Sequence, residues 1–130
     1  MSVRPSGRRA PEISVGKYAK HTLKVVYVFS TPGERAIEVA RFMKGYQIPF
    51  PAIIDRDQKL LKMLDGRASS EVYLVDKAGV LRYHGRVDDA TFNLKSVKSR
   101  DLQNAIVALI QNKKVAKPEV AAMGCAIPRL

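Results

Sequence analysis

Cys125 is the only residue of this 130-residue chain that carries a thiol nucleophile. It lies near the C-terminus, four residues before Arg129, and a nearby cation favours the thiolate that attacks disulfides. A single cysteine excludes an internal disulfide and a CxxC pair, and it is too few for a structural zinc site. Cys125 therefore indicates either a one-cysteine redox site that forms mixed disulfides or a free thiol without a role.

The other residues that could do chemistry are histidines and aspartates. His21 and His84 lie far apart and show no metal-ligand spacing, so we expect each to be a solvated or strand-edge histidine. Asp88 and Asp89 follow Arg86 in a segment typical of a loop. We expect them to cap that loop rather than to bind a cation. The sequence thus predicts no metal and no cofactor.

Charge and hydropathy narrow the class of protein. Lys and Arg number 23 against 12 Asp and Glu, which gives a net charge of +11. Such a surplus keeps a protein in solution and attracts anionic partners. The basic residues are spread along the chain without a basic helix stripe or an RNA motif, which disfavours nucleic acid and membrane surfaces as partners. No apolar run reaches the roughly 20 residues that span a bilayer.

Strand patterns recur through the middle of the chain. Residues 23–29 and 71–76 are rich in β-branched and aromatic side chains, which favours buried strands. Residues 52–54 predict a third, short strand. Residues 77–79 have turn chemistry and return the chain as a fourth strand at 80–84, so the last two strands form a hairpin.

Three helices are expected between and after these strands. Thr31 is expected to cap the first through a capping box with Glu34, and this helix ends near Tyr46. Asp55 with Gln58 repeats the capping pattern for a short helix. Ser99 caps the last helix, which closes at residues 112–114 with the positive charges of Lys113 and Lys114. The side chains expected to face inward in the first helix are Ile37, Ala40 and either Met43 or the stem of Lys44. Those of the second helix, which Gly66 ends, are Leu60, Leu61 and Leu64, and those of the third are Leu102, Ala105, Ile106, Leu109 and Ile110.

The order of the elements indicates the fold class. Strands alternating with helices, followed by a hairpin and a helix, predict an α/β three-layer sandwich of thioredoxin type with one mixed sheet. The folded domain is expected at 21–115, with a flexible basic extension at 1–20 and an irregular tail at 116–130. Because no secretory signal is evident, a cytoplasmic location is expected.

Several segments in this order resemble the redoxin branch of the thioredoxin superfamily, which includes the alkyl hydroperoxide reductase-like, thiol-specific antioxidant proteins. They are Pro49–Asp55, Leu60–Gly66, Glu71–Asp76 and Tyr83–Asp89, and Gly124–Ile127 resembles the tail of one subgroup. The resemblance covers about residues 18–127. It implies a thioredoxin-like fold and an antioxidant or thiol–disulfide oxidoreductase activity.

The catalytic unit of that family has no match here. In the family, a strand leads to a helix whose N-terminus carries the reactive cysteine. In the alignment we prefer, residues 23–29 are the strand after that unit, residues 18–20 end a lost helix, and the chain is N-terminally truncated. In the alternative, residues 23–29 are the active-site strand and Ser30–Gly33 replaces the CxxC. Both alignments leave Cys125 as the only candidate catalytic residue.

The substrate loop of the family also differs. There a Thr-Pro dipeptide with a cis proline precedes the strand at 71–76, whereas this chain has Ser69 and Ser70. A cis bond before a residue other than proline costs about 2.5–4 kcal/mol, so we expect Ser70 to be trans. The loop that receives a substrate backbone would then change shape.

These observations lead to two main hypotheses. The first is a redoxin-class protein whose activity is degenerate or incomplete in this chain unless a partner supplies the missing unit, which leaves its status as an enzyme open. The second is a non-catalytic thioredoxin-like module that binds a protein partner or a second copy through a groove or an open sheet edge. A basic accessory protein of a nucleic-acid complex is a third, less favoured hypothesis.

Overall fold

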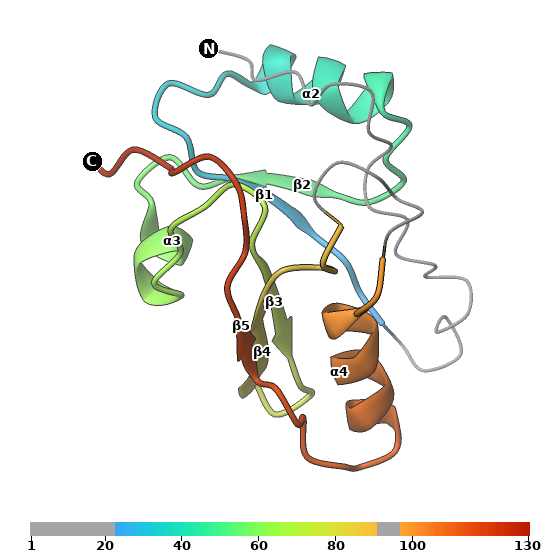
Figure 1. Cartoon of the computed structure of the whole chain (residues 1–130). Helices are drawn as coiled ribbons and strands as arrows, with labels where there is room; N and C mark the ends of the chain where they lie inside the picture. Colours follow the sequence, from blue (N-terminus) through green and yellow to red (C-terminus); the bar gives the residue numbers. More distant parts are fainter. Residues whose placement is uncertain (1–22, 91–96) are drawn as a thin grey trace. The chain divides into compact units, whose positions relative to one another are not determined.

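The computed structural model of the protein describes residues 23–90 and 97–130. The predicted extension at 1–20 and His21 lie outside the described residues. The elements follow one another as a mixed α/β chain (Figure 1), which confirms the predicted class. They are β1 (Tyr27–Phe29), α2 (Ala36–Gly45), β2 (Ala52–Ile54), α3 (Lys59–Met63), β3 (Val72–Val75), β4 (Leu81–Gly85), α4 (Asp101–Ile110) and β5 (Glu119–Val120).

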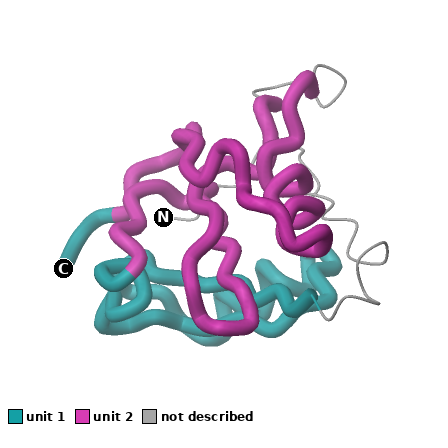
Figure 2. Tube along the Cα trace, turned by 90° about the horizontal axis from the view of Figure 1, so that it is seen from below, with its two compact units in different colours: residues 1–63, 128–130 teal, residues 64–127 magenta. Residues whose placement is uncertain are grey.

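The chain divides into two compact units (Figure 2). Unit 1 comprises Met1–Met63 and Pro128–Leu130, and unit 2 comprises Leu64–Ile127. The strands of the described residues form two sheets, one in each unit, with the orders β1-β2 and β3-β4-β5. The expectation of one mixed sheet is therefore corrected, because no backbone ladder joins the hairpin strands to the parallel pair.

In unit 1 the parallel strands β1 and β2 pack one face against α2. Tyr27 pairs with Ala52 and Phe29 with Ile54. The ring of Phe29 meets the ring of Phe42 edge-on at 5.6 Å, a geometry that aromatic pairs favour. Aromatic contact between β1 and α2 thus sets which side of the helix faces the sheet.

The first helix begins later than the sequence predicts. Thr31 does not cap it; the Thr31 carbonyl accepts a hydrogen bond from the Glu34 amide at 3.3 Å in a separate turn. Gly33 occupies the left-handed region of that turn at φ 82°, where glycine is the favoured residue. The turn must end before the helix can start, so the N-cap is Arg35, with no side-chain cap.

The buried face of α2 also differs from the prediction. Val39 is 6% exposed, whereas Ile37, expected to face inward, is 52% exposed. Ala40 is exposed as well, and Met43 is only half-buried. Because Phe42 packs on Phe29, the helix presents Val39 rather than Ile37 to the core.

Asp55 bonds the first turn of α3, as predicted, but the helix begins only at Lys59 and Gln58 does not complete the expected capping box. The Asp55 carboxylate accepts hydrogen bonds from the amides of Leu60 at 3.2 Å and Leu61 at 3.0 Å, and from the Ser30 hydroxyl at 3.0 Å. Burial raises the pKa of this carboxyl, but the hydrogen bonds outweigh burial and hold the pKa below its usual range. The fully buried Gln58 lies in the same turn.

Gln58 also fixes the C-terminal residues within unit 1. Its Nε2 donates to the carbonyl of Ser30 at 2.9 Å and to that of Pro128 at 2.7 Å. Its Oε1 accepts a hydrogen bond from the Leu130 amide at 2.9 Å. A buried side-chain amide that is so fully bonded is costly to replace.

Unit 2 is built on the predicted hairpin of β3 and β4. Asp76 closes the turn by accepting hydrogen bonds from Ala78 and Val80 at 2.9 and 3.0 Å. β5 then pairs with β4 in parallel, which corrects the expectation of a wholly irregular tail after residue 115. A Cβ atom at Gly85 would overlap the Val120 carbonyl, so glycine at this position permits the pairing.

Helix α4 provides the core of unit 2. Leu102, Ala105 and Ile106 are buried, as predicted, together with Tyr83 and Leu74 of the hairpin. Leu109 and Ile110 are half-buried.

The expected cap of α4 is wrong. The N-cap of the helix is Arg100, with no side-chain hydrogen bond. The Ser99 hydroxyl instead donates to Asp101 at 2.8 Å. Asp101 also pairs with Arg86 at 2.6 Å, so this buried carboxylate takes up the Ser99 hydroxyl that was expected to bond the helix amides.

Candidate functional site

Cys125 lies exposed on a C-terminal segment of unit 2 that pairs with residues 67–70. Its carbonyl accepts a hydrogen bond from the Ser69 amide at 2.9 Å. The next residue, Ala126, forms an antiparallel bridge with Ala68. The Ser70 hydroxyl donates to the Met123 carbonyl at 2.7 Å. The structure therefore brings together Cys125, Ser69 and Ser70, the three site residues that the sequence indicated.

The segment that carries Cys125 lies very close to the turn at residues 67–70. A Cβ atom at Gly124 would overlap the Ser70 Oγ and lie 3.3 Å from the Ser70 amide nitrogen. A side chain at position 124 would therefore push the Cys125 segment away from Ser70. The described residues contain no cis peptide bond, so Ser70 is trans, as predicted.

Glu71 anchors the turn to which the Cys125 segment pairs. Its carboxylate accepts hydrogen bonds from the amides of Ala68 at 2.9 Å and Arg67 at 3.2 Å. It also accepts from the Tyr73 hydroxyl at 2.5 Å and from His84 Nε2 at 3.0 Å. The carboxylate thus ties the 67–70 turn to both strands of the hairpin.

The environment of Glu71 favours its charged form. Its side chain is 10% exposed. Burial raises the pKa of this carboxyl, but the hydrogen bonds from Tyr73, His84 and the two amides bring the pKa below its usual range. The rings of Tyr73 and His84 stack at 4.5 Å. Sequence reasoning missed this cluster, although an acidic residue two positions before Tyr73 on the same strand face was a detectable signal.

The remaining predicted polar residues have structural contacts. His84 is half-buried in β4, the middle strand of its sheet, rather than at a strand edge. Asp88 accepts a hydrogen bond from the Ala90 amide at 2.9 Å, and Asp89 from the Lys98 and Ser99 amides at 2.9 and 3.0 Å. The two aspartates close their loop, as predicted. Across residues 23–90 and 97–130 no group of three His, Cys, Asp or Glu side chains could hold a metal.

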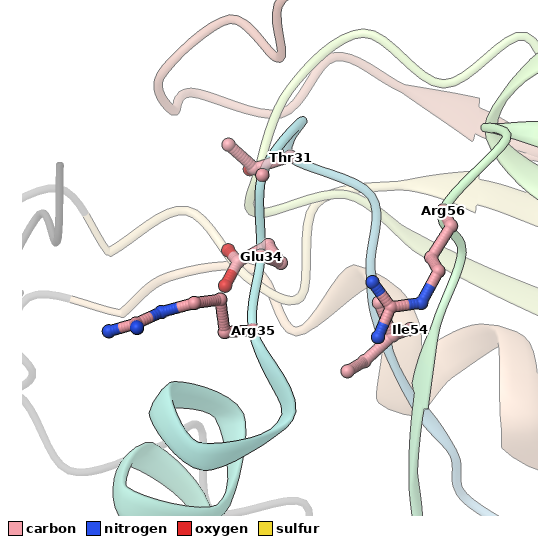
Figure 3. A pocket seen from close by; sticks show the side chains of 6 residues that line it. Thr31, Glu34, Arg35, Ile54 and Arg56 are labelled. Atoms are coloured by element: carbon pink, nitrogen blue, oxygen red, sulfur yellow. The ribbon is translucent and has the colours of Figure 1, made fainter.

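A separate cavity lies in unit 1, where the chain leaves β1 and β2 (Figure 3). Its volume is about 240 Å³. This is also where the alternative alignment places Ser30–Gly33, and the described residues have no thiol there. The cavity is lined by Thr31, Gly33, Glu34, Arg35, Ile54 and Arg56.

Two solved structures resemble this mixed α/β chain. A hypothetical protein from Sinorhizobium meliloti 1021 superposes with a TM-score of 0.78 and 31% identity over 90% of this chain and 67% of its own. An uncharacterized conserved protein from Geobacillus kaustophilus gives a TM-score of 0.75 and 22% identity over 88% of this chain and 64% of its own. No family model matches the chain, and no curated protein does.

The Sinorhizobium protein is similar enough in sequence and coverage that this chain belongs to the same family as that hypothetical protein. The Geobacillus structure shows a shared fold only. The chain spans about two thirds of the length of each. None of the described helices is long and apolar enough to cross a membrane.

Proposed function

We propose that this chain is a thioredoxin-like protein of the redoxin class whose single thiol, Cys125, acts by forming mixed disulfides. The observation that carries the proposal is the pairing of the Cys125 segment with Ser69 and Ser70. In the family that the sequence resembles, the loop at this position lies against the reactive cysteine. Here the backbone of the segment that carries Cys125 pairs with the same loop, and we infer that its thiol takes the place of the missing cysteine.

The proposed step is thiol–disulfide exchange. The Cys125 thiolate attacks one sulfur of a disulfide RSSR, forms a Cys125–SR bond and releases RS⁻, which takes up the proton that Cys125 lost. A second thiol must then release the chain, and the sequence has no second cysteine. Turnover therefore needs a thiol from another molecule, so the antioxidant or oxidoreductase activity is incomplete in this chain alone.

Glutathione disulfide is a suitable probe because it is anionic and the chain carries a charge of +11. Mass spectrometry should show one added glutathionyl group on the wild type and none on Cys125→Ser. We expect the folded chain to react about tenfold faster than the same chain in urea, because the proposed loop at Ser69 and Ser70 would hold the disulfide against the thiol, and a reactant held in place is attacked at lower entropic cost. A folded chain that reacts no faster than the unfolded one would identify Cys125 as a free thiol without a role.

Recognition of a partner strand is a second candidate, favoured by the open edge of β1. Within the described residues β1 pairs with β2 alone. Tyr27 and Phe29 bond toward the β2 side at 3.0 and 2.8 Å, so the backbone groups of Val28 between them face the other edge. Val26, Val28 and Ile53 are also 46%, 45% and 45% exposed, although parallel sheets are normally covered on both faces.

An extended partner segment with apolar and acidic residues in alternation fits this edge, given the positive charge of the chain. The probe is a blocked peptide of alternating valine and glutamate. Val28→Pro removes an edge donor and should abolish binding, whereas Val28→Thr should retain it. Equal binding by both variants would refute the candidate, and a dimer of the wild type in sedimentation would identify a second copy as the occupant.

A further inference from the structure

The side chain of Gln58 holds a short backbone segment within unit 1. The segment is Pro128–Leu130, which belongs to unit 1 although it follows Ile127 of unit 2 (Figure 2). The Gln58 Nε2 donates to the Pro128 carbonyl at 2.7 Å, and the Gln58 Oε1 accepts from the Leu130 amide at 2.9 Å. One side-chain amide thus bonds the C=O of one residue and the N–H of the second residue after it. A residue in a parallel ladder bonds the backbone of an extended neighbouring strand in the same pattern.

Contacts inside unit 1 orient the Gln58 amide for this task. Its Nε2 also donates to the Ser30 carbonyl at 2.9 Å, and the Ser30 hydroxyl donates to Asp55 at 3.0 Å. Ser30 and Asp55 are each 8% exposed, and Gln58 is fully buried. Because a carbonyl only accepts hydrogen bonds, the bond to Ser30 fixes which end of the amide carries the nitrogen. The remaining N–H and the Oε1 are thereby set to bind a backbone.

The bound segment indicates what the Gln58 amide selects. The side chains of Pro128, Arg129 and Leu130 are all exposed. The hydrogen bonds to Gln58 reach only their backbone, so these bonds do not depend on the types of the side chains. Proline suits the first position, because only its carbonyl is bonded and its fixed φ lowers the entropy that an extended segment loses on binding.

We propose that Gln58 is the recognition residue of a binding site for an extended, proline-containing segment of a partner protein, and that Pro128–Leu130 occupies this site until the partner displaces it. The partner segment must offer a carbonyl and, two residues later, an amide N–H. An empty site would leave one N–H and the Oε1 of a buried amide unpaired, which is costly, so the site favours exchange of occupants. The proposal uses neither Cys125 nor the edge of β1, and it stands independently of both proposed functions.

The experiment is an NMR titration of the full chain with the peptide acetyl-Ile-Pro-Arg-Leu-amide, which repeats the bound segment. The side-chain amide of Gln58 reports occupancy, and hydrogen exchange at the Leu130 amide should accelerate as the peptide displaces the segment. Leu130→Pro removes a donor from the internal segment, which then competes less. The peptide should therefore bind Leu130→Pro about fivefold more tightly than it binds the wild type, the effect of one hydrogen bond. Gln58→Leu should instead weaken binding about tenfold or more.

Leu130→Ala is the matched control, because it keeps the backbone N–H and shortens a side chain that is 67% exposed. Its affinity for the peptide should stay within about twofold of the wild type, since no hydrogen bond is lost. Circular dichroism verifies that each variant retains the fold.

A second peptide leaves the protein unchanged and keeps the test valid if Gln58→Leu does not fold. Acetyl-Ile-Pro-Arg-Pro-amide lacks the second N–H and should bind about fivefold more weakly than the first peptide. Equal binding of the two peptides would overturn the proposal, as would equal affinities of Leu130→Pro and Leu130→Ala. A wild-type dimer in sedimentation that Gln58→Leu abolishes would identify a second copy as the occupant and would also overturn it.

Discussion

Replacement of Glu71 by glutamine tests whether this carboxylate holds the turn beside Cys125. Glutamine keeps the shape, and its oxygen can still accept from the amides of Ala68 and Arg67. The amide nitrogen would then face Tyr73 and His84, which lie 2.5 and 3.0 Å from the carboxylate in the wild type. Two hydrogen bonds to a charged acceptor thereby become neutral.

The expected cost follows from the strengths of these bonds. Hydrogen bonds to charged groups contribute about 1.5–3 kcal/mol, and neutral ones about 0.5–1.5 kcal/mol. Two such changes at a site that is 10% exposed lower the free energy of unfolding of unit 2 by roughly 2 kcal/mol. Urea unfolding followed by far-ultraviolet circular dichroism measures this loss, and tyrosine fluorescence is a second probe because the chain has no tryptophan.

The difference in the free energy of unfolding between wild type and Glu71→Gln should depend on pH if its origin is electrostatic. The pKa of Glu71 is lower in the folded chain than its usual value, so its stabilisation is present above the unfolded pKa of about 4.3. It is lost as the pH falls through the lower folded pKa. The stabilities of wild type and Glu71→Gln should therefore begin to converge as the pH falls below about 4.3. Equal stability of wild type and Glu71→Gln at pH 7, or a stability difference that is unchanged at pH 3, would refute the role assigned to the Glu71 carboxylate. Glu119 is exposed, and Glu119→Gln is the control.

The remaining predictions concern packing and capping. Gly85→Ala should separate β5 from β4, because its Cβ overlaps the Val120 carbonyl. We expect faster exchange of the His84 and Arg86 amides, which bond the carbonyls of Pro118 and Val120, with a loss of about 2 kcal/mol. Val39→Ala should cost about 1–3 kcal/mol and Ile37→Ala less than about 0.5 kcal/mol in urea unfolding; equal costs would contradict the observed face of α2. Asp55→Asn should destabilise unit 1 at pH 7, and the difference from wild type should shrink as the pH falls below the unfolded pKa of about 3.9, because the folded pKa of Asp55 is lowered and its stabilisation disappears as the pH falls through that value.

The sequence predicted correctly the features that depend on residues close together in the chain. The hairpin turn at Asp76 and the capping of α3 by Asp55 depend on residues within a few positions of each other, and both are confirmed. The buried stripe of α4 follows from its helical period. Capping by Thr31 failed because Gly33 adopts a left-handed turn, which the residue types alone left open.

Long-range contacts were not predictable in the same way. The sequence indicated Cys125 and the Ser69–Ser70 dipeptide separately, as a thiol and as the substrate loop of a resembled family. Their proximity depends on β5 and on the pairing of Ala126 with Ala68, both in a segment expected to be irregular. The role of Glu71 likewise arises from His84, which the hairpin brings close to it.

The most direct test of the proposed function compares the glutathione disulfide reaction rates of the wild type and Gly124→Ala. The added Cβ overlaps the Ser70 Oγ and should displace the Cys125 segment, so the rate should fall about tenfold, to that of the chain in urea. Gly124→Ala combined with Ser70→Gly removes the overlap and should restore most of the rate. An unchanged rate in Gly124→Ala would contradict the claim that the 67–70 turn sets the reactivity of Cys125.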